Sequence, residues 1–121
     1  MDKSVQHISI LALPVTVLQN TFKGTWVDAK GSTITADAMP LGITQEDAAV
    51  GETVSVTVIG TASMDLNGIA SAAVMQGDVI CLNEGSMVVK TATAALTAKD
   101  KVHGIVLYDA AATGHAEVLI K

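Results

Sequence analysis

One short sequence pattern occurs twice in this chain, and its spacing limits the folds that are compatible with it. The pattern GI-xxx-DAA stands at residues 42–49 and again at residues 104–111, each time followed by a turn containing Gly and by a strand-like segment. The second turn is one residue longer, but a residue added in a loop leaves the side-chain alternation of the next strand unchanged. We therefore expect one strand–turn–strand unit to be used twice, at residues 41–60 and 103–120.

The segment after the first turn has the pattern of a half-buried antiparallel strand. In TVSVTV, Val54, Val56 and Val58 alternate with hydroxyl-bearing residues and would face one side of a sheet. We expect the strand to continue past Gly60, with a bulge or bend at that glycine. Turn-forming residues recur roughly every 8 to 12 positions, as in β-sandwiches and barrels. The predicted fold is all-β: a small antiparallel β-sandwich or barrel with an extended N-terminal arm and little or no helix.

The composition indicates that this domain leaves apolar surface exposed. Half of the 121 residues are hydrophobic, whereas only 2% are aromatic, and the mean hydropathy is +0.47. A chain of this length is expected to form one domain with a modest core. Apolar surface left over after folding would be covered by an oligomer or by a docking partner.

The first 20 residues are interpreted as an extended arm that precedes a single β domain at residues 21–121. Their apolar part, residues 8–18, contains Pro14, is too short to span a membrane and lacks the cleavage site of a signal peptide. Such an arm either closes the sheet of its own domain or pairs with a neighbouring chain. Trp26 is either a core residue or an interface anchor. The candidate contacts with other subunits are Val5, Ile8, Ile10, Val15, Val17, Phe22 and Trp26.

The charge and the spacing of reactive residues argue against several classes of function. The net charge is −5 and the seven basic residues are all Lys, which disfavours nucleic-acid binding. The single Cys81 permits neither an intramolecular disulfide nor a zinc cluster. His7, His103 and His115 are far apart and form no metal-ligand motif. No nucleophile elbow, phosphate loop or dinucleotide fingerprint occurs, so we expect no metal, no cofactor and no enzymatic activity.

The order of the motifs resembles the small head-decoration (capsid-cement) proteins of tailed bacteriophages. That family has a Leu-Gly-Val/Ile strand, an Ala-Ala-Gly-Glu turn, a Val-rich strand ending in Gly, an Ala-Gly-Asp strand entry and a closing Gly-Ile/Val-Ala-rich hairpin, in this order. The resemblance covers about residues 39–121 and leaves the arm outside, and Gln76-Gly77 and Lys99-Asp100 depart from the usual Ala-Gly entries. The matching segments are LGI at 41–43, DAAVGETV at 47–54, VTVIGTA at 56–62, QGDV at 76–79, GIVL at 104–107, AAATG at 110–114 and VLI at 118–120.

The resemblance implies a structural virion protein without a cofactor. It would be made in the host cytoplasm and would bind the major capsid protein as a homotrimer on the outer surface of the head, across capsomer junctions. The candidate subunit contacts would then also be candidate capsid contacts, and neither nucleic acid nor a membrane would be a partner. The alternative is a carbohydrate- or surface-binding β-module of a phage fibre or spike. Its aromatic platform would have to come from Phe22, Trp26 and Tyr108.

Overall fold

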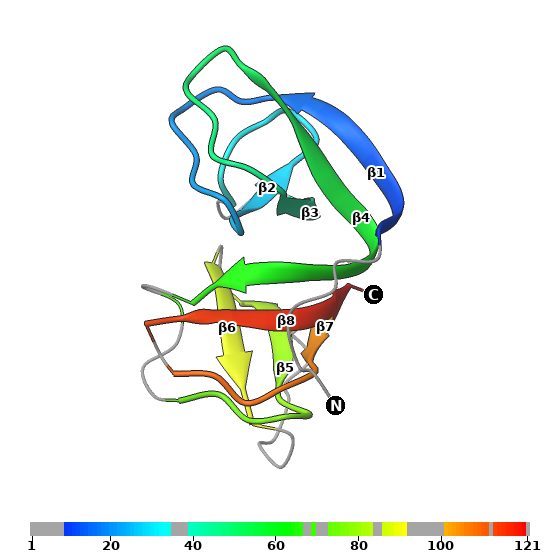
Figure 1. The fold of residues 1–121 in the computed structure, drawn as a ribbon, viewed down its shortest axis with the longest axis vertical. Coiled ribbons are helices and arrows are strands. Elements are labelled where there is room, and N and C mark those ends of the chain that lie inside the picture. The colour runs from blue at the N-terminus through cyan, green and yellow to red at the C-terminus, as the bar shows by residue number, and fades with distance from the viewer. Residues whose placement is uncertain are drawn as a thin grey trace.

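The computed structural model describes residues 9–34, 39–66, 69, 73–83, 86–91, 101–111 and 113–120. These residues contain no helix and form eight antiparallel strands (Figure 1). The strands are β1 (Ser9–Thr16), β2 (Trp26–Asp28), β3 (Pro40–Thr44), β4 (Thr53–Asp65), β5 (Val79–Asn83), β6 (Ser86–Lys90), β7 (Lys101–Val106) and β8 (His115–Ile120). They belong to one strongly curled sheet, which confirms the predicted all-β fold.

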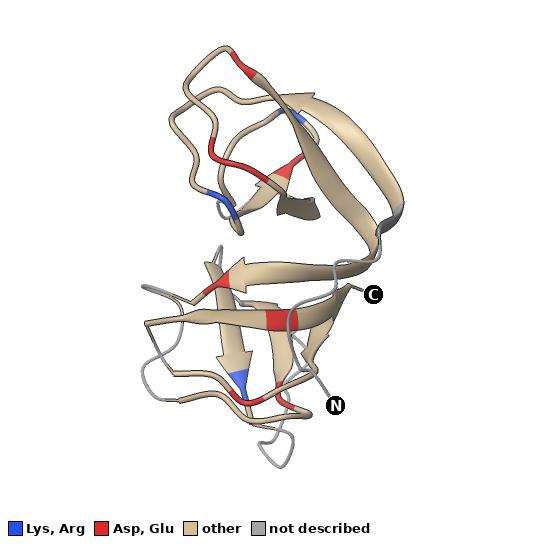
Figure 2. Cartoon of the chain, in the orientation of Figure 1, with Lys and Arg blue, Asp and Glu red and all other residues tan. Residues whose placement is uncertain are grey.

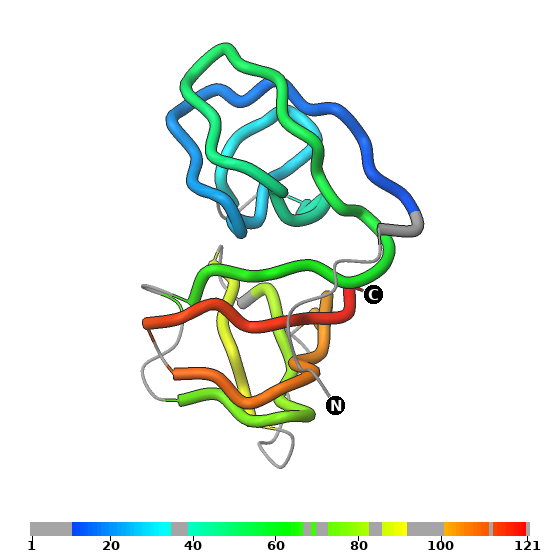
Figure 3. The backbone as a smooth tube through the Cα atoms, in the orientation of Figure 1, coloured from blue at the N-terminus to red at the C-terminus, as the bar shows by residue number. Residues whose placement is uncertain are grey.

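The longest strand, β4, joins two halves of this sheet. The strand order is β2-β3-β4-β8-β7-β5-β6, and β1 pairs with β4 outside this path. The first half of β4 pairs with β1 and β3, and its second half pairs with β8. The chain bends near Gly60, whose φ is +119°, as predicted for this glycine (Figure 3). The bend separates a first lobe, residues 9–58, from a second lobe, residues 60–120.

The repeat predicted from the sequence is present as two equivalent strand pairings. β3 and β4 pair in the first lobe as β7 and β8 pair in the second, and the members of each equivalent pair are 62 positions apart in the sequence. These pairs are Ile43–Thr57 and Thr44–Val56 in the first lobe, and Ile105–Leu119 and Val106–Val118 in the second. The repeated pattern therefore marks a repeated piece of structure.

The duplication also includes strands that the sequence comparison did not match. β2 pairs with β3 as β5 pairs with β7, and a register shift follows the second pair in both lobes. β1 pairs with β4 as the second half of β4 pairs with β8. Representative equivalent pairs are Trp26–Ile43 and Val79–Ile105, Val27–Gly42 and Ile80–Gly104, and Val15–Val54 and Met64–Ala116. Each lobe is thus one copy of the same unit, and β4 serves as the last strand of one copy and the first strand of the next.

β1 contributes to the sheet of its own chain. From Ser9 onward, part of the segment interpreted as an arm is paired with β4, and among the described residues β1 has no other strand partner. Pro14 lies opposite Ser55 within this strand. Proline lacks the amide donor of a central strand and is tolerated where only one side of a strand is paired. Residues 1–8 lie outside the described residues.

Each lobe has its own hydrophobic core, and the first lobe also contributes to the second core. Trp26 and Ile43 lie on strands of the first lobe but pack among the buried residues of the second. The indole Nε1 of Trp26 donates a hydrogen bond to Met64 Sδ at 3.2 Å. The first core contains Val15, Val17, Val27, Ala48, Val54 and Val56. The second contains Trp26, Ile43, Ala62, Met64, Leu66, Val74, Ile80, Met87, Val106, Ala116, Val118 and Ile120.

The two lobes meet through backbone as well as side chains. The amide of Asp65 on β4 donates a hydrogen bond to the carbonyl of Gly24 at 2.9 Å. A Cβ at Gly24 would lie 2.7 Å from the Asp65 nitrogen and 2.9 Å from the Ser63 oxygen. Only glycine allows so close an approach with φ at +85°. The turn before β2 therefore rests directly on the first strand of the second lobe.

Candidate functional site

The groups capable of acid–base or metal chemistry do not gather in the described part of the chain. No three His, Cys, Asp or Glu side chains there could hold one metal ion. His103 lies beside the Trp26 ring, with 6.3 Å between the ring centroids, whereas His115 begins β8 and Cys81 is buried on β5. Burial lowers the pKa of His103 below 6.5, and the nearby charge of Lys101 lowers it further. His103 is therefore a neutral side chain at the joint between the lobes at pH 7.

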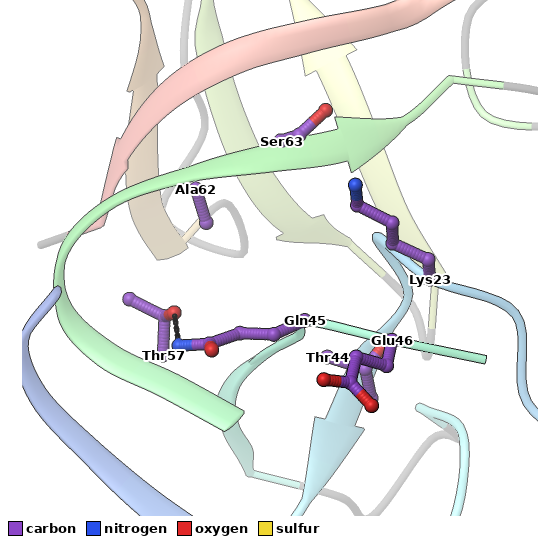
Figure 4. Close-up of a pocket in the computed structure, with 7 residues that line it drawn as sticks. All are labelled: Lys23, Thr44, Gln45, Glu46, Thr57, Ala62 and Ser63. Atoms are coloured by element: carbon purple, nitrogen blue, oxygen red, sulfur yellow. Dashed lines mark hydrogen bonds between the residues drawn. The ribbon is translucent and has the colours of Figure 1, made fainter. Parts of the chain in front are cut away.

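A small pocket lies between the end of β3 and the two halves of β4 (Figure 4). Its volume is about 120 Å³. Gln45 Nε2 donates a hydrogen bond to Thr57 Oγ1 at 2.8 Å in its wall. The lining contains an ammonium and a carboxylate group but no Ser–His or Cys–His pair, the arrangement that activates a nucleophile. The residues that line it are Lys23, Thr44, Gln45, Glu46, Thr57, Ala62 and Ser63.

Charged residues are scattered over both lobes (Figure 2). The lysines of the described residues are Lys23, Lys30, Lys90 and Lys101, and they lie on different elements. A nucleic-acid site is marked by lysines and arginines clustered on one face, and such a cluster is not seen in this part of the chain. The described residues also contain no helix that could span a bilayer.

The structure distributes the candidate contact residues between core and surface. Val15 and Val17 are buried in the first core and Trp26 in the second. Trp26 is only 3% exposed, so it is not available to a glycan or to a partner surface. Phe22, in contrast, is 72% exposed. Val5 and Ile8 lie outside the described residues, and Ile10 is described only as part of the backbone of β1.

Phe22 stands on a rigid turn of the first lobe. Residues 21 and 48 form an isolated antiparallel bridge with two backbone hydrogen bonds of 2.8 Å. Asp47 Oδ1 accepts a hydrogen bond from the Lys23 amide at 2.7 Å, and Thr44 Oγ1 donates one to the Phe22 carbonyl at 2.9 Å. These bonds fix the backbone on both sides of Phe22 while its ring remains in solvent. The ring is not part of the hydrophobic core formed by the described residues of the first lobe.

The second lobe holds Met75 in the equivalent position. Residues 74 and 110 form the corresponding bridge, with backbone hydrogen bonds of 2.8 and 3.0 Å. Asp109 Oδ1 accepts a hydrogen bond from the Gln76 amide at 2.8 Å, as Asp47 does in the first lobe. Met75 is 62% exposed, and the neighbouring Tyr108 is also exposed. The repeated Asp-Ala in GI-xxx-DAA thus has a structural role: in each lobe it holds a turn that presents a large apolar side chain.

Phe22 is among the candidate contacts named from the sequence, and Met75 is not. The available signal was the pair of tripeptides Phe22-Lys23-Gly24 and Met75-Gln76-Gly77, each an apolar residue, a polar residue and a glycine. Both glycines have a positive φ, +85° and +92°. The two tripeptides are 53 positions apart, whereas the two GI-xxx-DAA patterns are 62 positions apart. The difference arises because the chain between tripeptide and pattern is longer in the second lobe than in the first. A search at one constant spacing therefore does not detect the second turn.

The two exposed turns occupy equivalent positions in the two lobes. A search of curated proteins found no match to the chain. The family model described as phage cement protein matches residues 15–121, which include the second lobe, the first lobe from Val15 onward and both turns. It follows that the chain belongs to the phage cement protein family, and that it is a structural component of the phage capsid.

Proposed function

We propose that this chain binds the outer surface of the assembled phage head, contacts the major capsid protein and stabilises the junctions between capsomers. The observation that carries this proposal is the pair of exposed side chains Phe22 and Met75, held by the same hydrogen bonds in two equivalent lobes. Two equivalent contacts on one chain fit a shell that offers the same surface repeatedly. The subunit would then bind two capsid protein copies at once.

The mechanism is linked binding. Burying one large apolar side chain contributes roughly 1.5–3 kcal/mol. When the first lobe has docked, the second faces its own site at a high effective concentration, so the two modest contacts reinforce each other. A ligand that binds the assembled shell and not its dissociated parts shifts the equilibrium toward the shell. The protein would therefore stabilise the head without any chemical step.

The remaining features of the proposal follow from charge and from exposed surface. The net charge of −5 keeps an exterior subunit soluble and gives it no attraction to the packaged nucleic acid. Apolar side chains outside the two turns, among them Leu13 and Leu119, are also exposed. Contacts between copies in a homotrimer would cover such residues. The subunit would be made in the host cytoplasm and would join the head after the shell has assembled.

The test is cosedimentation of the purified chain with undecorated heads of its own phage. We expect Phe22→Ser and Met75→Ser each to weaken binding by about tenfold or more, and the double variant to weaken it further. Met39→Ser is the matched control, because Met39 is also strongly exposed but lies on neither turn. A double variant that binds like the wild type would refute the proposed contacts.

Stabilisation is tested separately by heating. Heads saturated with the wild-type chain should rupture at a higher temperature than undecorated heads, and the double variant at the same concentration should give a smaller increase. If the wild-type chain binds heads but leaves their rupture temperature unchanged, it is an attached subunit that does not act as cement.

A further inference from the structure

One apolar face of the first lobe is covered by the second lobe, whereas no described residue covers the same face of the second lobe. In the first lobe this face consists of Gly24, Trp26, Ile43 and Thr57, which we call the covered face. Trp26 is 3% exposed, Ile43 is fully buried and Thr57 is 1% exposed. The second half of β4 lies against this face, with the Asp65 amide bonded to the Gly24 carbonyl and Met64 Sδ bonded to the Trp26 indole.

The equivalent residues of the second lobe form what we call the open face. They are Val79, Ile105 and Leu119, which occupy the same positions in the strand pairings, together with Gly77 in the equivalent turn. Leu119 is 36% exposed where its counterpart Thr57 is buried, and Val79 and Ile105 are half-buried. A Cβ at Gly77 would meet nothing within 4 Å, whereas a Cβ at Gly24 would collide with β4. The second lobe therefore presents an apolar face that has no cover among the described residues.

The internal joint shows which kind of surface fits such a face. The covered face of the first lobe packs against the first strand of the next copy of the repeat, the second half of β4. In the first lobe the counterpart of that strand is β1. Residues 62–65 of β4 form the internal joint, and residues 13–16 of β1 occupy the same positions in the strand pairing. Among these, Leu13, Pro14 and Thr16 are exposed, and β1 pairs with β4 alone among the described strands. The described residues of each chain thus include one open face. They also include β1, the counterpart of the strand that covers the equivalent face in the internal joint.

We infer that the open face binds β1 of a second copy of this chain, so that the lobe-to-lobe joint within the chain is repeated between chains. The contact is head to tail: the open face of one copy meets residues 13–16 of the next. Interfaces of this kind give a closed ring when the rotation between copies divides a full turn. The inference rests on the homotrimer proposed above only for the number of copies in that ring.

The test uses the native mass of the purified full chain, with no heads present. Leu119→Asp places a carboxylate on the open face, and Leu13→Asp places one on β1. We expect each variant alone to be monomeric under conditions where the wild type is an oligomer, with association weakened more than about tenfold, because a desolvated and unpaired carboxylate is unfavourable. Circular dichroism of each variant verifies that it is folded, and Met39→Asp should keep the wild-type mass.

Mixing the two variants distinguishes a head-to-tail contact from any other. A Leu119→Asp chain still has an intact β1, and a Leu13→Asp chain still has an intact open face. An equimolar mixture should therefore form dimers that neither variant forms alone, and no larger ring. A monomeric wild type, a Leu119→Asp chain that keeps the wild-type mass, or a mixture that stays monomeric would each overturn the inference. None of these results depends on binding to heads through Phe22 and Met75, so the two proposals can fail independently.

Discussion

At the scale of single residues, Gly24 and Gly77 occupy the same turn in two different surroundings. Both have a positive φ, which costs a residue with a Cβ about 1–2 kcal/mol. Alanine at Gly24 would in addition place its Cβ 2.7 Å from the Asp65 nitrogen, whereas alanine at Gly77 would meet open space. We expect Gly24→Ala to lower the free energy of unfolding by about 2 kcal/mol more than Gly77→Ala. Urea denaturation at one protein concentration measures the difference, and equal losses would contradict it.

His103 is the residue through which pH should act on the joint between the lobes. Burial and Lys101 lower its pKa below 6.5, and its Nε2 is buried with no hydrogen-bond partner among the residues that the structure describes. The unfolded chain then binds a proton at a higher pH than the folded chain, so the stabilising contribution is complete well above pH 6.5 and is lost as the pH falls through 6.5 toward the lowered value.

The pH prediction is tested with two neutral substitutions. We expect the melting temperature of the wild type to fall between pH 7.5 and 5, and the His103→Gln chain to show a smaller fall. Met39→Gln replaces an exposed residue that does not titrate; it serves as the control and should keep the wild-type slope. Parallel curves for the wild type and His103→Gln would show that the proton binds elsewhere.

At the scale of the elements, the sequence predicts the strands whose side chains and turns are repeated. The Gly-Ile of the GI-xxx-DAA pattern lies within β3 in the first lobe and within β7 in the second. The Asp and the first Ala of that pattern have the same structural role in both lobes. The bend at Gly60 was predictable for the related reason that only one residue type suits its φ. Position-specific constraints of this kind preserve residue identity, and therefore they are visible in one sequence.

The equivalence of β1 with the second half of β4 was not predictable in this way. Val15 and Met64 occupy equivalent positions, as do Trp26 and Val79, but the members differ in size and in what they contact. Gly51 and Gly77 are each followed by an acidic residue and then by a strand, so they look equivalent in the sequence. In the structure, however, Gly77 is equivalent to Gly24. Packing requires only that a side chain be apolar and fill the local space, so equivalent strands can share a fold without sharing residues. Met75 was not recognised as the counterpart of Phe22 for a different reason, because the two turns are 53 rather than 62 positions apart in the sequence.

At the scale of the whole molecule, the joint determines whether two small lobes behave as one domain. The first core is built from side chains no larger than Val, which contribute little buried area each. The two largest buried side chains on β2 and β3 of the first lobe, Trp26 and Ile43, pack instead into the second core. Much of the apolar burial of the first lobe is thus realised only when the second lobe is folded. The two lobes should therefore unfold together.

Cooperative unfolding can be tested at Trp26. In the wild type we expect a single urea transition, with the same midpoint by tryptophan fluorescence and by far-UV circular dichroism. Trp26→Ala removes the indole from the second core and its hydrogen bond to Met64 Sδ, at a cost of about 3–5 kcal/mol. Followed by circular dichroism, this variant should show two transitions or one markedly broadened transition, because the first lobe loses its main link to the second.

Val27→Ala is the matched control on the same strand: its side chain lies within the first core, so it should lower stability and keep one sharp transition. If Trp26→Ala also keeps one sharp transition, the backbone contact at Gly24 and the continuity of β4 are sufficient to couple the lobes.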